Sequence, residues 1–221
     1  MRYRRARTAG PTYFFTVVTF MRRPILCNTD SIEKIKTAFT QVIKKHPFNV
    51  DAMVLLPDHL HCLWTLPDND QDFSTRWRLI KSRFTRACDG KSKLIPSKSR
   101  RSKKEQTVWQ RRFWEHVIRD EDDYVRHLEY IHYNPVKHGF VDAPAEWPHS
   151  TFHRFVRNGL YPNDWGAGKK IRFDKSIGNE WVNVGLRFAN PTYGAWWLHG
   201  SELSAKGHNP LNGRRTKKVN T

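Results

Sequence analysis

The sequence predicts an α+β domain with a ferredoxin-like split βαβ fold, an antiparallel sheet to which one further helix is added. Two observations lead to this prediction. Apolar side chains alternate between strand-like and helix-like spacing in the order β-α-β-β-α-β-α over residues 1–166. The 221-residue chain also contains nine Trp and 38% hydrophobic residues, which suffices for a core and argues against a purely disordered basic polypeptide.

The first strand and the first helix follow from contrasting apolar patterns. Residues 13–20 are rich in β-branched and aromatic side chains and lie between turn-forming glycine and proline residues, which predicts a strand. Residues 31–45 carry apolar side chains at helical spacing and follow Asp30, a residue type that caps helix N-termini. We therefore expect the domain to begin with a strand and a helix.

The next three elements are a hairpin and a helix. Residues 50–56 and 60–66 are apolar runs separated by Pro57 and Asp58, a turn signal that predicts two strands. Residues 74–88 then place their large apolar side chains on one stripe, which predicts a second amphipathic helix.

A basic loop separates this helix from the last two elements. Residues 90–106 lose all apolar periodicity, and residues 113–118 then predict a fourth strand. Asp120 begins a third helix, whose first turn carries the acidic side chains that a helix dipole favours. That helix is expected to end near Asn134, because Pro135 disfavours a helical conformation in the residue before it.

The composition changes after residue 166. Residues 167–221 are rich in Gly, Asn, Lys and Arg and contain no long periodic segment. We therefore expect a folded domain over residues 1–166 and a basic, irregular extension over residues 167–221.

The charge of the chain limits the class of partner. Thirty-nine Lys and Arg against 21 Asp and Glu give a net charge of +18, which suits a polyanion such as nucleic acid or an anionic membrane surface. The longest apolar run is far shorter than the roughly 20 residues of a membrane span. Three widely spaced cysteines indicate neither a disulfide framework nor a zinc knuckle. We therefore expect a cytoplasmic protein without a membrane span.

Two histidines of the third predicted strand form the first candidate site. His59 and His61 are two residues apart, so their side chains point to the same face of a strand, away from the apolar residues that flank them. Two imidazoles at this spacing could share one metal ion, or they could be surface or hydrogen-bonded histidines. A histidine-triad hydrolase would need another histidine at Leu63, which argues against that class.

The third predicted helix supplies the second candidate. Tyr130 and Asn134 are four residues apart and therefore share one helical face, an arrangement that a tyrosine in the core or at an interface would also satisfy. Together with the histidine pair and the positive charge, it suggests chemistry on a phosphodiester. Two imidazoles and an amide oxygen would hold a divalent ion, and a tyrosine hydroxyl can attack phosphorus to form a covalent intermediate.

Several motifs occur together and in one order. They are Pro57–His61, Trp109-Gln110, Phe113–Arg119, the run Tyr130-Ile131-x-x-Asn134-Pro135-Val136 with Gly139-Phe140-Val141, and Trp147-Pro148-x-Ser150. In this combination the chain resembles the REP-associated tyrosine transposases, relatives of the single-tyrosine insertion-sequence transposases. The resemblance covers roughly residues 1–166.

The resemblance implies a bacterial, nucleoid-associated enzyme that cleaves single-stranded DNA at hairpins of repetitive extragenic palindromes (REP), as a monomer or homodimer. It implies that Tyr130 is the nucleophile, which forms a 5′-phosphotyrosine link and releases a 3′-hydroxyl. It also implies that His59, His61 and Asn134 ligate Mg²⁺ or Mn²⁺. The insertion-sequence relatives have a glutamine at the position of Asn134.

Three alternatives stay open at this point. Tyr133 is the main rival nucleophile, although it is turned about 60° around the helix from Tyr130. The chain could instead be a non-catalytic protein that binds structured DNA or RNA, or a metal-dependent phosphohydrolase that uses water. Only the tyrosine mechanism produces a covalent protein–DNA adduct.

Basic side chains gather in three segments: an N-terminal arm, the second helix, and the loop that follows it. Few acidic residues lie nearby, so phosphate contact is favoured over a solvated basic face. The expected DNA contacts are Arg2, Arg4, Arg5, Arg7, Arg76, Arg78, Lys81, Arg83, Arg86, Lys91, Lys93, Arg100, Arg101, Lys103 and Lys104.

Overall fold

The computed structural model describes residues 10–90, 93–102, 106–173 and 177. They contain an antiparallel sheet with the strand order β2-β3-β1-β4. This order is the one that a split βαβ unit produces, so the predicted fold class is confirmed. The strands are β1 (Thr12–Val18), β2 (Asn49–Leu55), β3 (His59–Thr65) and β4 (Trp114–Val117).

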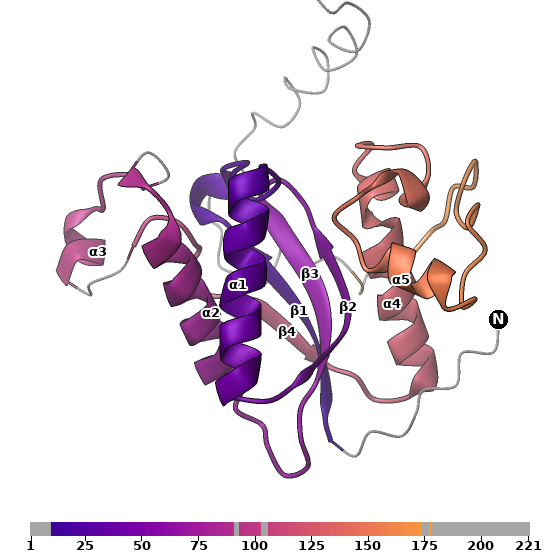
Figure 1. The fold of residues 1–221 in the computed structure, drawn as a ribbon, viewed down its shortest axis with the longest axis horizontal. Coiled ribbons are helices and arrows are strands. Elements are labelled where there is room, and N and C mark those ends of the chain that lie inside the picture. The colour runs from indigo at the N-terminus through magenta and orange to yellow at the C-terminus, as the bar shows by residue number, and fades with distance from the viewer. Residues whose placement is uncertain (1–9, 91–92, 103–105, 174–176, 178–221) are drawn as a thin grey trace, which may run out of the picture. The chain divides into compact units, whose positions relative to one another are not determined.

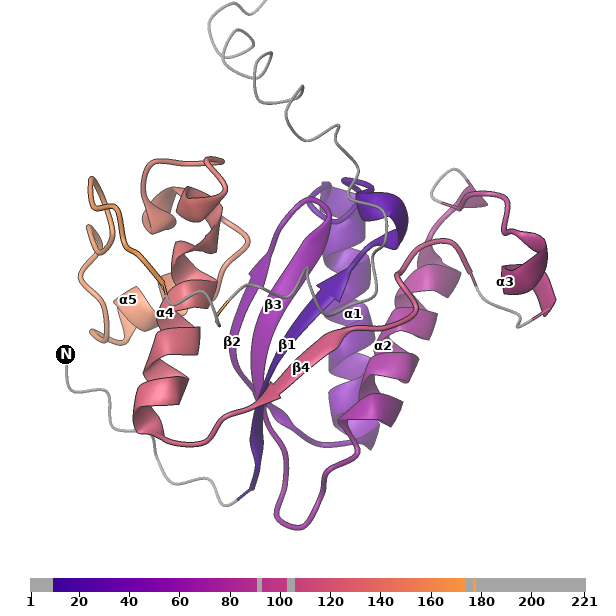
Figure 2. The same ribbon diagram turned by 180° about the vertical axis from the view of Figure 1, so that it is seen from behind.

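Helices cover both faces of this sheet (Figures 1 and 2). On one face lie α1 (Thr29–Lys45) and α2 (Phe73–Ala87), and on the other lie α4 (Glu121–Lys137) and the short α5 (Phe152–Arg157). Every residue of the two central strands, β1 and β3, is buried as a consequence. A residue's position along these strands therefore decides which of two cores it enters.

The start of α1 and the basic loop differ from the sequence predictions. The cap of α1 is Asn28, whose side chain accepts a hydrogen bond from the Ser31 amide at 2.8 Å, whereas the predicted cap Asp30 lies in the first turn. The segment predicted as an unstructured basic loop contains a short helix, α3 (Lys98–Ser102).

The helix α4 continues past its proline, which contradicts the predicted end near Asn134. Pro135 lacks an amide donor, but backbone hydrogen bonds after it complete the last turn of the helix. The amide of Gly139 donates to the Val136 carbonyl at 2.9 Å, and that of Phe140 donates to the Pro135 carbonyl at 3.0 Å. Gly139 has φ 68°, the left-handed conformation that this closure requires. The extra turn carries Lys137 to the end of the helix.

The chain beyond residue 166 continues along α4 as far as it is described. The Tyr133 hydroxyl donates to the Lys169 carbonyl, and the Phe173 ring lies edge-on to the Tyr130 ring at 5.4 Å. The rest of the expected extension, like the N-terminal arm, lies outside the described residues, so the predicted division at residue 166 stays a prediction. Among the helices that are described, none combines the length and apolar character needed to cross a bilayer.

Candidate active site

The histidine pair lies on the α4 face of β3. His59 and His61 are both buried, and their ring centroids are 4.9 Å apart. Leu60, Cys62 and Trp64 point the opposite way, into the core under α1 and α2, as the strand alternation predicts. The sheet therefore presents two imidazoles side by side to the helix that carries Tyr130.

Hydrogen bonds fix the orientation of both imidazole rings. His61 Nδ1 lies 2.9 Å from the hydroxyl of Thr16, its partner across β1 and β3. His59 Nδ1 lies 2.6 Å from Asp58 Oδ1, and Asp58 Oδ2 accepts a hydrogen bond from Arg22 at 2.6 Å. A polar partner on Nδ1 is the usual support of a metal-binding histidine. In such a histidine the other ring nitrogen, Nε2, is the atom that could ligate a metal.

Both imidazoles are held in their neutral form. Burial lowers the pKa of His59, and burial together with the neighbouring His59 lowers the pKa of His61 well below its usual value. A neutral imidazole keeps a lone pair for coordination. The pair is thus ready to bind a cation at neutral pH without first losing protons.

One face of α4 lies opposite the pair. The Tyr130 ring is 5.3 Å from the His61 ring, and the His138 ring at the helix end is 5.3 Å from the His59 ring. Asn134 lies one helical turn from each of these two residues. Asn134 therefore lies on the face of α4 that carries Tyr130 and His138.

The polar atoms of the Asn134 side chain are buried and unsatisfied within the described part of the chain. The residue is fully buried, and neither its Oδ1 nor its Nδ2 has a hydrogen-bond partner among the described residues. The same holds for His61 Nε2. Buried polar atoms without partners are rare and call for an explanation such as a bound ion. These atoms fit a divalent cation that takes nitrogen and oxygen ligands.

Lys137 contacts the Tyr130 hydroxyl. Its ammonium donates a hydrogen bond to the hydroxyl oxygen at 3.0 Å and lies 4.4 Å from the ring centroid. Tyr130 itself is only 1% exposed, with Phe14 and Phe173 packed against its ring. The Tyr130 side chain is therefore almost completely enclosed by its neighbours.

The rival nucleophile Tyr133 faces a different part of the molecule. Its hydroxyl donates to the Lys169 carbonyl and lies 3.4 Å from the Ile171 amide, which donates to it. Its ring packs against Trp165 and Phe173. These contacts assign Tyr133 to the packing of the C-terminal segment, whereas Tyr130 contacts the histidine pair.

Arg76, an expected DNA contact, is instead a buried structural residue. It is 3% exposed, and its guanidinium pairs with Asp70 at 2.6 Å and donates to the carbonyls of His46 and Pro47. Asp70 accepts two of its hydrogen bonds, and the Asp72 carbonyl accepts a further one at 2.9 Å. All five N–H groups of the guanidinium thus have partners and none is left for a phosphate, so the prediction for Arg76 is wrong. The residue joins α2 to the loop before β2.

The other expected DNA contacts occupy the layer opposite Tyr130 or lie outside the described residues. Arg78 and Arg86 are exposed on α2, where Lys81 donates to the Gln110 carbonyl and Arg83 to Gln41. In the loop, Arg100 lies 4.0 Å from the Phe20 ring centroid, Arg101 is exposed and Lys93 is half-buried. Outside the described residues lie Arg2, Arg4, Arg5, Arg7, Lys91, Lys103 and Lys104.

Sequence reasoning missed three supports of this site. Lys137 had a usable signal, because seven residues separate it from Tyr130 and two helical turns bring it back to the same face. Asp58 directly precedes His59 and was considered only as a turn residue. Thr16 had no local signal, since only the pairing of β1 with β3 brings it to His61.

Comparison with known proteins identifies the family. Residues 9–134 match the family model described as "Transposase IS200 like". The chain is 47% identical over 165 residues to the REP-associated tyrosine transposase of Escherichia coli K12, an alignment that covers 75% of this chain and 90% of that protein. The chain belongs to this family. It is therefore a relative of proteins that move DNA.

Two further comparisons, with a curated protein and with a solved structure, show similarity over most of each relative's length. A putative member from Haemophilus influenzae is 42% identical over 175 residues, covering 79% of this chain and 98% of that protein. A solved structure of a REP-associated tyrosine transposase bound to a REP hairpin is 44% identical, with a TM-score of 0.62 over 79% of this chain and 95% of the other. This chain thus spans nearly the whole length of these relatives.

Proposed function

We propose that this REP-associated tyrosine transposase is a metal-dependent endonuclease and strand transferase that cleaves single-stranded DNA at REP-type hairpins, with Tyr130 as nucleophile. One observation carries the proposal. The Tyr130 ring lies 5.3 Å from the ring of His61, a buried, neutral imidazole whose Nε2 lacks a partner among the described residues. The REP hairpin in the related solved structure supports the substrate class.

The metal ligands in this proposal are His59, His61 and Asn134. Mg²⁺ prefers oxygen ligands and keeps several waters, whereas Mn²⁺ accepts imidazole more readily, so Mn²⁺ is expected to bind more tightly to this set. A divalent cation held there would polarise the scissile phosphate and offset charge that develops on it. The carboxylate of Asp58 and the hydroxyl of Thr16 would keep both rings aligned.

The proposed cleavage is a transesterification. The Tyr130 oxygen forms a bond to phosphorus while the bond from phosphorus to the 3′ oxygen breaks. The proton that the phenol loses is balanced by the proton that the 3′-hydroxyl gains, and no water is consumed. Lys137 stabilises the negative charge on the phenol oxygen through its 3.0 Å hydrogen bond. The 5′-phosphotyrosine link conserves the energy of the broken phosphodiester bond, so a DNA 3′-hydroxyl can later attack it and rejoin the strand.

An aromatic series extends from the proposed metal ligands to the surface. The His138 ring contacts that of His59 and stacks at 6.0 Å on Phe140, which in turn stacks at 5.4 Å on Trp147. Phe140 is 45% exposed. An exposed ring beside a phosphate site suits stacking of an unpaired base, which every base can provide regardless of sequence. We assign Phe140 to the binding of the single-stranded segment next to the hairpin.

The basic residues of α2 and the following loop would hold the flanking DNA. Arg78, Arg86 and Arg101 are exposed, but α2 covers the face of the sheet opposite Tyr130. A DNA strand that contacts both these arginines and Tyr130 must therefore pass around an edge of the β-sheet. This arrangement suits phosphate contacts outside the cleavage point, which add affinity without reading sequence.

The test is cleavage of a single-stranded oligonucleotide that carries a REP-type hairpin, with Mn²⁺, Mg²⁺ or EDTA. We expect a covalent protein–DNA adduct with either metal and none with EDTA. Tyr130→Phe should abolish the adduct and keep hairpin binding, while the matched variant Tyr133→Phe should retain the adduct. Cleavage without an adduct would indicate a hydrolase that uses water, and binding without cleavage would indicate a non-catalytic protein; either result overturns the proposal.

A further inference from the structure

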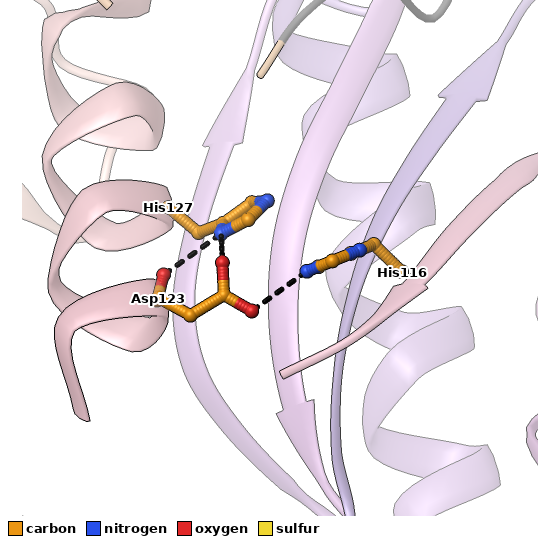
Figure 3. A group of neighbouring side chains, drawn as sticks. All are labelled: His116, Asp123 and His127. Carbon is orange, nitrogen blue, oxygen red and sulfur yellow. Dashed lines mark hydrogen bonds and ion pairs between the residues drawn. The ribbon is translucent and has the colours of Figure 1, made fainter. Parts of the chain in front are cut away.

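A second cluster of metal-ligating side chains joins β4 to the first half of α4. Figure 3 shows Asp123 between His116 and His127, with one carboxylate oxygen facing each ring. Asp123 Oδ2 lies 2.8 Å from His116 Nε2, and Asp123 Oδ1 lies 3.2 Å from His127 Nδ1. One potential ligand atom from each of the three residues lies within 4.8 Å of the other two. Two imidazoles and a carboxylate are a common ligand set for zinc.

Two of the three residues are buried, and the cluster is held in place by its surroundings. Asp123 and His127 are each 2% exposed, and the two histidine rings stack 4.7 Å apart. The Arg119 amide donates to Asp123 Oδ2 at 3.1 Å, and Asp120 accepts from the Asp123 amide at 2.7 Å. The carboxylate therefore keeps its position without a metal, which lowers the ordering cost of binding one.

The charges of the cluster also suit a cation. Burial acts to raise the pKa of Asp123, but hydrogen bonds from His116 and the Arg119 amide outweigh it and lower the pKa to about 2. Burial lowers the pKa of His127. Arg119 and Arg126 approach Asp123 at 3.4 and 3.6 Å from the solvent side, with side chains 69% and 48% exposed, so both can turn away.

This cluster is separate from the proposed active site. The Phe14 ring lies between them, 5.5 Å from the His61 ring and 4.8 Å from the His127 ring. No residue belongs to both sets. His127 nevertheless lies three positions before Tyr130 on α4, so anything that fixes the cluster also fixes the helix that carries the nucleophile.

We propose that His116, Asp123 and His127 form a second metal site, which binds a transition-metal ion of the Zn²⁺ class and ties β4 to α4. At present the ring nitrogens of His116 and His127 face the Asp123 carboxylate as N–H donors. A neutral imidazole binds a metal through the ring nitrogen that carries no proton. Metal binding therefore requires the proton of each ring to move to its other nitrogen. Imidazole ligands favour Zn²⁺ over Mg²⁺. The role of this ion is structural, and the proposal does not depend on DNA cleavage.

The test measures Zn²⁺ bound per chain by equilibrium dialysis and elemental analysis, with the full-length protein free of any affinity tag. The double variant His59→Ala/His61→Ala removes the proposed catalytic ligands and should still bind one Zn²⁺. Adding His116→Ala should abolish that binding and the rise in melting temperature that Zn²⁺ causes. His116 has a side chain 25% exposed, so alanine is tolerated, and circular dichroism verifies the fold.

Two outcomes would overturn the proposal. If the folded double variant binds no Zn²⁺, the cluster is only a hydrogen-bonded network. If the triple variant retains the ion, the ion binds elsewhere on the chain. Neither outcome affects the proposed DNA cleavage, which is tested separately by the adduct on Tyr130.

Discussion

Replacement of Lys137 by methionine tests how the site activates Tyr130. The substitution keeps most of the aliphatic stem and removes the ammonium that lies 3.0 Å from the Tyr130 oxygen. A hydrogen bond to a charged group contributes about 1.5–3 kcal/mol. At about 1.4 kcal/mol for each factor of ten in rate, Lys137→Met should slow attack on the phosphate by about 10- to 150-fold.

The assay is the rate of adduct formation in a single turnover, with enzyme in excess over a hairpin oligonucleotide and Mn²⁺ saturating. These conditions remove the contribution of DNA affinity. Lys137→Arg should recover part of the rate, because it restores a cationic donor. Lys44→Met removes one exposed positive charge from α1, in the other layer, and should leave the rate unchanged. A Lys137→Met rate within threefold of the parent protein would refute this role.

Three further predictions concern the supports of the site and its DNA contacts. Asp58→Asn should weaken Mn²⁺ binding about 10- to 100-fold in isothermal titration, because its carboxylate orients the adjacent metal ligand; unchanged affinity would contradict this. Arg76→Gln should reduce the free energy of unfolding in urea by about 2–3 kcal/mol and leave the salt dependence of DNA binding unchanged. Arg78→Gln should leave stability unchanged and lower, by about 1, the slope of the logarithm of the DNA-binding constant against the logarithm of the salt concentration. Phe140→Ala should cost about 1–3 kcal/mol of single-strand affinity in fluorescence anisotropy, and affinity within twofold of the parent would rule out base stacking.

Local periodicity was enough to predict much of the fold and the pairing of candidate residues. Strand alternation placed His59 and His61 on one face, and helical spacing placed Tyr130 and Asn134 on another, because each pair depends on a single element. The strand order followed from the succession of elements. These features depend on short-range geometry that the sequence expresses directly.

Features that depend on contacts between distant segments were not predictable in this way. His116 and Asp123 meet because β4 and α4 pack together, and the burial of Arg76 depends on partners from two loops. The end of α4 was mispredicted because the local preference of Pro135 is outweighed by the backbone hydrogen bonds that close the last turn. Charge patterns likewise did not distinguish a phosphate-binding arginine from a structural one.

Peptide mapping of the trapped adduct tests the central claim most directly. The protein is incubated with Mn²⁺ and a hairpin oligonucleotide, digested, and analysed by mass spectrometry, while the released strand is tested for extension by a polymerase. We predict a 5′-phosphate linked to Tyr130 and an extendable 3′-hydroxyl on the released strand. A phosphate linked to Tyr133, or a cleaved strand with no phosphotyrosine peptide, would contradict the account.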